Sequence, residues 1–233
     1  MKWSEFFTSS VGKKLVMALT GLFLISFLVI HVGLNACIWV GDEGSTFNRA
    51  ANFMGASLLI RAMEYVLFAG FILHIIQGYV LERRNLTRRG KGYRITVGNK
   101  GSKWYSRTMG LLGTLLLLFL IMHIYHFWTP SRLGGIGNIE PLAETTINGK
   151  TYHDLYGAML KVFQNPVVVI LYVIGCISLA YHLMHGFQSA FRTLGVHNHR
   201  YLSLLTGFGK GFSIIISLAF AMMPVSIYLG WVN

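Results

Sequence analysis

Four histidines lie inside long apolar stretches of the sequence, one in each stretch: His31, His74, His123 and His182. An ionisable side chain at membrane depth is costly and is usually retained because it serves a function. An imidazole in this setting can form a hydrogen bond between helices, or it can ligate a metal through a ring nitrogen. Each histidine taken alone fits either chemistry, so the arrangement of the four has to decide between them.

The composition around these histidines is that of an integral membrane protein. The 233 residues are 54% hydrophobic and only 12% charged, with a mean hydropathy of +0.55, outside the range of a soluble domain. The net charge of +12 does not indicate nucleic-acid binding, because the basic residues lie in loops between apolar runs and no nucleic-acid motif is present. The two cysteines, Cys37 and Cys176, exclude a cysteine zinc site and predict no disulfide.

Five hydrophobic runs are long enough to cross a bilayer, which predicts an all-α, five-helix bundle forming a single transmembrane domain over 1–233. The fourth run opens with Asn165-Pro166, a helix N-cap followed by proline at the first helical position. Asn148-Gly149, in the longest loop, predicts a turn or hairpin. The expected helices cover about 15–40, 56–81, 108–128, 166–191 and 211–231.

The loops differ strongly in charge. The amino-terminus and the connectors at 82–107 and 193–210, with Arg192 directly before the second connector, hold 15 of the 20 lysines and arginines, and the opposite loop set holds 5. By the positive-inside rule the amino-terminus is cytoplasmic and the carboxyl-terminus is periplasmic.

Depth along the helices sorts the four histidines into two levels. At 1.5 Å per residue, His74 and His182 lie about 12 and 15 Å from the cytoplasmic ends of their helices. His31 and His123 lie about 27 and 24 Å from theirs, so the two levels are about 12 Å apart. Two imidazoles from facing helices at equal depth are what six-coordinate haem iron needs, because the porphyrin fills the other four positions. The sequence therefore predicts two stacked haem b groups, an outer one on His31/His123 and an inner one on His74/His182.

Small residues flank two of these histidines at one-turn spacing: Gly70 and Gly78 around His74, and Ser178 and Gly186 around His182. Small side chains on a ligand's face leave room for a flat macrocycle. The alternative is that they serve close helix packing, as small residues in membrane helices commonly do.

Two further histidines lie three residues from predicted ligands, His126 after His123 and His185 after His182. Histidines at i and i+3 share a helix face and could serve a di-iron or zinc site. We expect one member of each doublet to bind haem iron and the other to reach a propionate, a quinone or the membrane interface.

Several of these patterns coincide in one known family. The chain resembles the dihaem cytochrome b membrane anchors of succinate dehydrogenases and fumarate reductases, the five-helix single-anchor type of the complex II group. The resemblance covers nearly the whole length and rests on these stretches: SSVGKKLVMALTG before the first helix, His31 with Asn35, Arg61 and Glu64 ahead of His74, and His182-Leu183-Met184-His185-Gly186-Phe187 ending at Leu194-Gly195.

The resemblance implies a subunit of succinate:quinone oxidoreductase in the bacterial cytoplasmic membrane. The family has one haem ligand on each of the first four helices, which matches His31, His74, His123 and His182 and favours His182 over His185. A flavoprotein (FAD) subunit and an iron-sulfur subunit would dock on the cytoplasmic face. Electrons would pass between the iron-sulfur subunit and menaquinone through the two haems.

Glu64 is the candidate for proton-coupled quinone chemistry, because it is the only carboxylate within a predicted span and lies on the outer half of the second helix. The alternative is a structural ion pair with Arg61, one turn away.

Two other functions fit parts of the pattern. A cytochrome b anchor of a hydrogenase or formate dehydrogenase would share the bis-histidine haems but dock a different partner. A membrane non-haem di-iron enzyme would need histidine clusters at the cytoplasmic helix ends, whereas two of the four key histidines lie on the other side.

Overall fold

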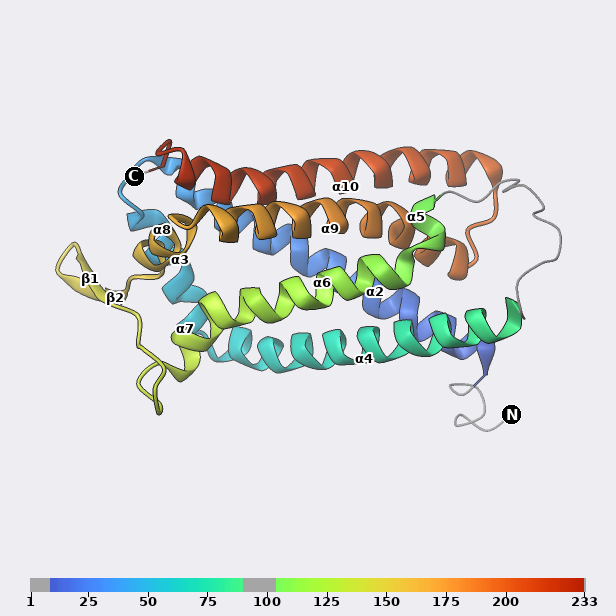
Figure 1. Cartoon of the computed structure of the whole chain (residues 1–233), viewed down its shortest axis with the longest axis horizontal. Helices are drawn as coiled ribbons and strands as arrows, with labels where there is room; N and C mark the ends of the chain where they lie inside the picture. The colour runs from blue at the N-terminus through green and yellow to red at the C-terminus, as the bar shows by residue number, and fades with distance from the viewer. Residues whose placement is uncertain (1–8, 90–103, 233) are drawn as a thin grey trace.

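Five long helices run side by side and form an elongated bundle in the computed structural model, which describes residues 9–89 and 104–232 (Figure 1). Most of the predicted basic connector, residues 90–103, lies outside the described residues. Within the described residues, five helices are long and apolar enough to cross a membrane: Ser10–Val40, Leu58–Arg84, Met109–Leu133, Pro166–Thr193 and His199–Tyr228. The predicted all-α membrane bundle is confirmed, and the chain is a multi-pass membrane protein.

The membrane helices are built from the following elements: α2 (Ser10–Asn35) continued by the 3₁₀ turn η1 (Ala36–Val40), α4 (Leu58–Arg89), α6 (Met109–His123) continued by the π-helical turn η2 (Ile124–Trp128) and α7 (Thr129–Leu133), α9 (Pro166–Thr193) and α10 (His199–Tyr228). A short helix, α5 (Trp104–Arg107), precedes α6. Helix α9 packs against α10, α2 and α6, while α4 packs chiefly on α2.

The helix ends follow local capping. The Ser9 hydroxyl accepts a hydrogen bond from the Gly12 N–H, so α2 starts five residues before the predicted position. Asn165 caps α9 as predicted, its side chain accepting from the Val167 N–H. Asn198 caps α10 in the same way, so that helix begins at His199 and not near residue 211. The predicted connector at 193–210 is therefore mostly helical.

The end of the bundle opposite the start of α2 carries a group of short elements, which we call the cap: α3 (Ser45–Ala56), β1 (Glu144–Ile147), β2 (Lys150–His153) and α8 (Leu155–Phe163) (Figure 1). Strands β1 and β2 form an antiparallel hairpin turning at Asn148 and Gly149, both with positive φ, as the sequence predicted. Helices α3 and α8 were not predicted, because both were assigned to polar loops.

Hydrogen bonds and apolar packing fix the cap to the bundle. The Asn48 side chain donates to Asp154 Oδ1 at 2.8 Å, and its Oδ1 accepts from the Tyr156 N–H at 2.9 Å. Phe47, Tyr156 and Phe163 are buried in one core with Tyr172 of α9 and Ile227 of α10. The cap is thus continuous with the core of the membrane helices at this end.

Candidate metal centres

The histidine pair nearer the cap joins α2 to α6. The rings of His31 and His123 have centroids 5.7 Å apart and are nearly perpendicular, with an interplanar angle of 87°. Phenylalanines one turn earlier stack on both rings, Phe27 on His31 at 5.1 Å and Phe119 on His123 at 5.7 Å. Asn35 donates from Nδ2 to the His31 carbonyl oxygen at 2.8 Å. Aromatic packing therefore fixes the planes of both imidazoles in a largely apolar environment.

The second pair joins α4 to α9. The rings of His74 and His182 have centroids 6.2 Å apart and an interplanar angle of 63°. A glycine from a neighbouring helix lies against each ring. A Cβ placed on Gly21 of α2 would stand 3.4 Å from His74 Cε1, and one on Gly113 of α6 would stand 3.9 Å from His182 Cε1. The two helices that carry the other histidine pair, α2 and α6, therefore approach this pair closely through glycines.

The spacing in both pairs is close to that of two imidazoles on one metal ion. A transition metal binds an imidazole nitrogen at about 2.0–2.1 Å, as zinc does, so two axial nitrogens lie about 4 Å apart and the ring centroids about 6.4 Å apart. The observed separations, 5.7 and 6.2 Å, are slightly shorter. Within the described residues no third His, Cys, Asp or Glu side chain joins either pair as a possible ligand. Two protein ligands are the number that haem iron takes up.

Hydrogen bonding assigns the tautomer of His74. The Thr20 hydroxyl donates to the Val16 carbonyl at 2.8 Å, and Thr20 Oγ1 lies 3.1 Å from His74 Nδ1. Since the hydroxyl proton is used in the helix, Nδ1–H of His74 is the donor and Thr20 Oγ1 the acceptor. This leaves the Nε2 lone pair of His74 free to bind a metal. Thr20 was not identified from the sequence.

Two imidazole nitrogens are buried without a partner. Among the described residues, Nδ1 of His123 and Nδ1 of His182 have no hydrogen-bond partner. A buried polar nitrogen without a partner carries a free-energy cost, and a metal bound at that Nδ1 would offset it, whereas a metal bound at Nε2 would not. One histidine of each pair shows this feature, so each pair has a ring nitrogen free to ligate a haem iron.

The two pairs lie at different levels of the bundle. Thr20, which contacts His74, is eleven residues before His31 on α2. Gly113, which contacts His182, is ten residues before His123 on α6. At 1.5 Å per residue the two intervals correspond to about 15–17 Å along the bundle. This agrees in order with the two predicted levels and is slightly larger than the predicted separation.

The small residues that suggested room for a macrocycle mostly serve helix packing. A Cβ on Gly70 would stand 2.9 Å from the Phe23 ring, and one on Gly78 would stand 3.3 Å from Met17. Ser178 is buried and donates to the Leu112 carbonyl at 3.0 Å. Of the three glycines among them, only Gly186 has space for a Cβ with no other atom within 4 Å. The glycines that do lie against imidazoles are Gly21 and Gly113, which the sequence analysis missed.

The second histidine of each doublet lies outside the ring pairs. His126 stacks on Tyr172 of α9 with centroids 5.8 Å apart, and its Nδ1 lies 3.0 Å from the tyrosine hydroxyl. Tyr172 in turn meets His123 edge on, at 6.1 Å. His185 is partly buried one turn from His182. Proximity therefore singles out His123 and His182 in their doublets, and ligation itself stays a prediction.

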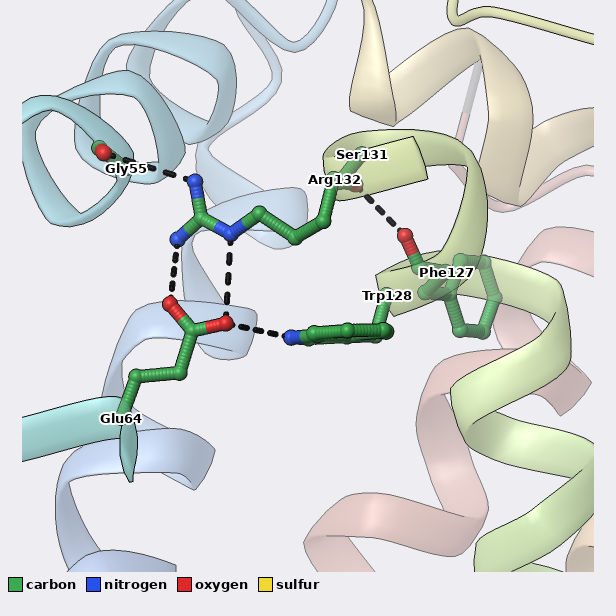
Figure 2. A network of polar contacts seen from close by, with 6 residues as sticks. All are labelled: Gly55, Glu64, Phe127, Trp128, Ser131 and Arg132. Atoms are coloured by element: carbon green, nitrogen blue, oxygen red, sulfur yellow. Dashed lines mark hydrogen bonds and ion pairs between the residues drawn. The ribbon is translucent and has the colours of Figure 1, made fainter. Parts of the chain in front are cut away.

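Glu64 is held in a polar network that joins α4 to the end of the third membrane helix (Figure 2). Its Oε2 accepts from Arg132 Nη2 at 2.8 Å, and its Oε1 accepts from Arg132 Nε at 3.3 Å and from the Trp128 indole N–H. Arg132 also donates from Nη1 to the Gly55 carbonyl at 3.4 Å. The predicted alternative was a structural ion pair of Glu64 with Arg61. Glu64 does form an ion pair, but its partner is Arg132, and Arg61 is exposed.

Comparison with known proteins gives one distant relative. The chain is 20% identical over 193 residues to the succinate dehydrogenase cytochrome b558 subunit of Bacillus subtilis (strain 168), covering 82% of this chain and 81% of the relative. No family model and no solved structure matches the chain. The resemblance inferred from the sequence is therefore confirmed at the level of distant similarity: the chain is a remote relative of the cytochrome b anchors of succinate dehydrogenase.

Proposed function

We propose that this chain is the membrane-anchoring cytochrome b subunit of a succinate:quinone oxidoreductase, a succinate dehydrogenase or fumarate reductase, in a bacterial cytoplasmic membrane. The observation that carries the proposal is the presence of two histidine pairs, at ring separations of 5.7 and 6.2 Å, at two levels of one membrane bundle. The printed name of the distant relative supports the same role.

In this proposal His31 and His123 hold one haem b, and His74 and His182 hold the other. When bound, the two haems supply one-electron carriers at two depths of the membrane. The protein contributes ligand orientation: Thr20 fixes the His74 tautomer, and Phe27 and Phe119 fix the ring planes of the other pair. Apolar surroundings keep water away from both pairs, which is one of the protein's means of setting a redox potential.

The partners would bind at the end of the bundle opposite the cap. Basic residues gather at the helix ends there, including Lys13, Arg83, Arg107, Arg192 and Arg200. A positively charged face favours an acidic partner surface, and we assign it to docking of the iron-sulfur subunit, which carries the flavoprotein subunit. The pair His74/His182 is the nearer to this face, so electrons would enter or leave there.

Menaquinone would react at the cap end, near Glu64. Reduction of a quinone takes up two protons with two electrons, so a carboxylate near the outer haem can deliver or accept a proton at the quinone oxygen. Trp128 and Arg132 position the Glu64 carboxylate, whose side chain is 19% exposed in the bundle. Oxidation of quinol uses the same group in reverse.

Substitution of Glu64 tests the quinone assignment. Glu64→Gln removes the titratable proton while keeping an acceptor for Trp128, so quinone turnover should be abolished with both haem spectra intact. Arg61→Gln, on the same helix but exposed, is the matched control and should leave turnover unchanged. Unchanged turnover in Glu64→Gln would remove this residue from the quinone site.

The function as a whole is tested by purification from the native membrane. A tagged chain should bring down a flavoprotein and an iron-sulfur protein in equal amounts, and the complex should reduce a menaquinone analogue with succinate or oxidise its quinol with fumarate. Recovery of a hydrogenase or formate dehydrogenase partner in their place would contradict the proposal and support the other class of cytochrome b anchor.

A further inference from the structure

A basic groove at the cap end has no part in the proposed electron transfer. It has a volume of about 760 Å³ and lies between α3 and β2, with Arg49, Asn52, Phe53, Ser57, Lys150 and Tyr152 among its lining residues. Its size is within the range of small-molecule binding sites. The groove reaches the turn between α3 and α4, where the second membrane helix begins.

The charges that line the groove are positive. Arg49 and Lys150 are both exposed, and neither forms an ion pair with another described residue. Lys150 is kept in place by a cation–π contact, its Nζ lying 5.5 Å from the centre of the Tyr152 ring. The amide of Asn52 and the hydroxyl of Ser57 add polar groups to the same wall. The groove therefore offers two unneutralised cations with polar groups beside them, which suits an anion.

Asp42 is a carboxylate that contacts a residue lining the groove. Asp42 Oδ2 accepts from both the N–H and the hydroxyl of Thr46, a lining residue, at 2.9 and 2.5 Å. The hydroxyl hydrogen bond, followed by those from backbone N–H groups, lowers the pKa of Asp42 below its usual value. One oxygen of Asp42 is thus bound at the start of α3, and its single negative charge can offset only part of the two positive charges of Arg49 and Lys150.

An apolar surface adjoins the basic groove. Phe53, which lines it, is 68% exposed, and Leu58 and Leu59, which directly follow Ser57, are 85% and 74% exposed. These leucines open the membrane span that begins at Leu58. Cationic groups and exposed apolar side chains thus meet at the point where the chain enters the bilayer. That layout matches a phospholipid, with a phosphate group in the groove and acyl chains along the helix.

We propose that this groove binds the phosphate group of an anionic phospholipid, with Arg49 and Lys150 as its charged contacts. The apolar flank selects a lipid over free phosphate, because inorganic phosphate would gain nothing from Phe53, Leu58 or Leu59. The two cations select an anionic lipid over a zwitterionic one, whose own ammonium group would meet Arg49 and Lys150.

Lipid titration of the full-length chain tests the site. The chain is delipidated in a nonionic detergent and titrated with phosphatidylglycerol, with phosphatidylcholine of the same acyl chains, and with inorganic phosphate, and bound copies are counted by native mass spectrometry. We expect tighter binding of phosphatidylglycerol than of either other ligand. Arg49→Gln and Lys150→Gln should each weaken it about fivefold, and the double variant roughly 30-fold.

Two controls separate this site from general charge and from misfolding. Lys161→Gln removes an exposed cation elsewhere at the cap end and should leave phosphatidylglycerol binding unchanged. The charge-preserving pair Arg49→Lys with Lys150→Arg should bind within about twofold of the parent. The proposal is overturned if the double glutamine variant binds phosphatidylglycerol normally, if phosphatidylcholine binds as tightly, or if inorganic phosphate binds in this groove and the lipid does not.

Discussion

At the scale of single residues, the chemistry predicted from the sequence depended on four histidines, and the structure adds the groups that orient them. Thr20, Gly21 and Gly113 contact the pair His74/His182 from neighbouring helices. They could not be found from the sequence, because a contact between helices depends on the rotation of each helix about its axis. The depth of each histidine follows from the rise per residue alone. The histidines predicted to lie at equal depth are adjacent in the structure, His31 to His123 and His74 to His182.

Thr20→Val should change the haem held by His74 and no other. Loss of the hydrogen-bond acceptor makes the imidazole a weaker donor to iron, so the midpoint potential of that haem should rise. Thr114→Val is the matched control, because Thr114 also donates to a carbonyl four residues earlier but is exposed. Redox titration of both variants, followed optically, gives the two potentials, and an equal rise in the Thr114 variant would contradict the role given to Thr20.

Gly21→Leu should prevent binding of the same haem. A side chain at this position begins 3.4 Å from His74 Cε1, so its further carbons would enter the space beside the imidazole. A Cβ placed on Gly33, on the same helix, would have no other atom within 4 Å. Gly33→Leu is therefore the control and should leave the haem content unchanged. The measurement is haem per chain from the pyridine haemochrome spectrum. A full complement of haem in Gly21→Leu would show that Gly21 does not border the cofactor.

At the scale of elements, the long apolar helices were predictable and the short cap helices were not. Hydropathy finds a span of this length because lipid contact requires it, whereas α3 and α8 are short and amphipathic and lie in stretches that look polar overall. The signals for their ends were present: Asp154 caps α8 and Asn198 caps α10. The π-helical turn η2 has no sequence signal of this kind. It changes the register of the helix over the turn that ends at Trp128 and before Arg132, the two residues that reach Glu64.

Arg132→Gln should loosen the attachment of α7 to α4. The Arg132–Glu64 pair is mostly buried, with side chains 21% and 19% exposed, so breaking it should cost more than an exposed pair and less than a fully buried one, about 2 kcal/mol. Lys161→Gln breaks a pair at 4.0 Å whose side chains are 82% and 92% exposed, and should have almost no effect. Denaturant unfolding in detergent compares the two variants, and equal stabilities would mean that the Glu64 network does not stabilise the bundle.

At the scale of the whole molecule, the two ends of the bundle differ: one is basic, and the other carries the cap. Helix α2 begins at the basic end, and α10 finishes at the cap (Figure 1). The uneven distribution of lysine and arginine predicts that the basic end faces the cytoplasm. A reporter that is active only in the periplasm should therefore work when fused after residue 233 and fail when fused before residue 1. The reverse pattern would invert the orientation and place the proposed partner surface on the wrong side.

The central claim is that each histidine pair ligates one haem, and it is tested most directly by single alanine variants of the four histidines in the purified chain. The account predicts two haem b per parent chain with two resolvable midpoint potentials. His31→Ala and His123→Ala should lose or alter the same component, and His74→Ala and His182→Ala the other. The account is contradicted if His31→Ala and His123→Ala affect different components, or if the parent chain binds no haem when haem is supplied.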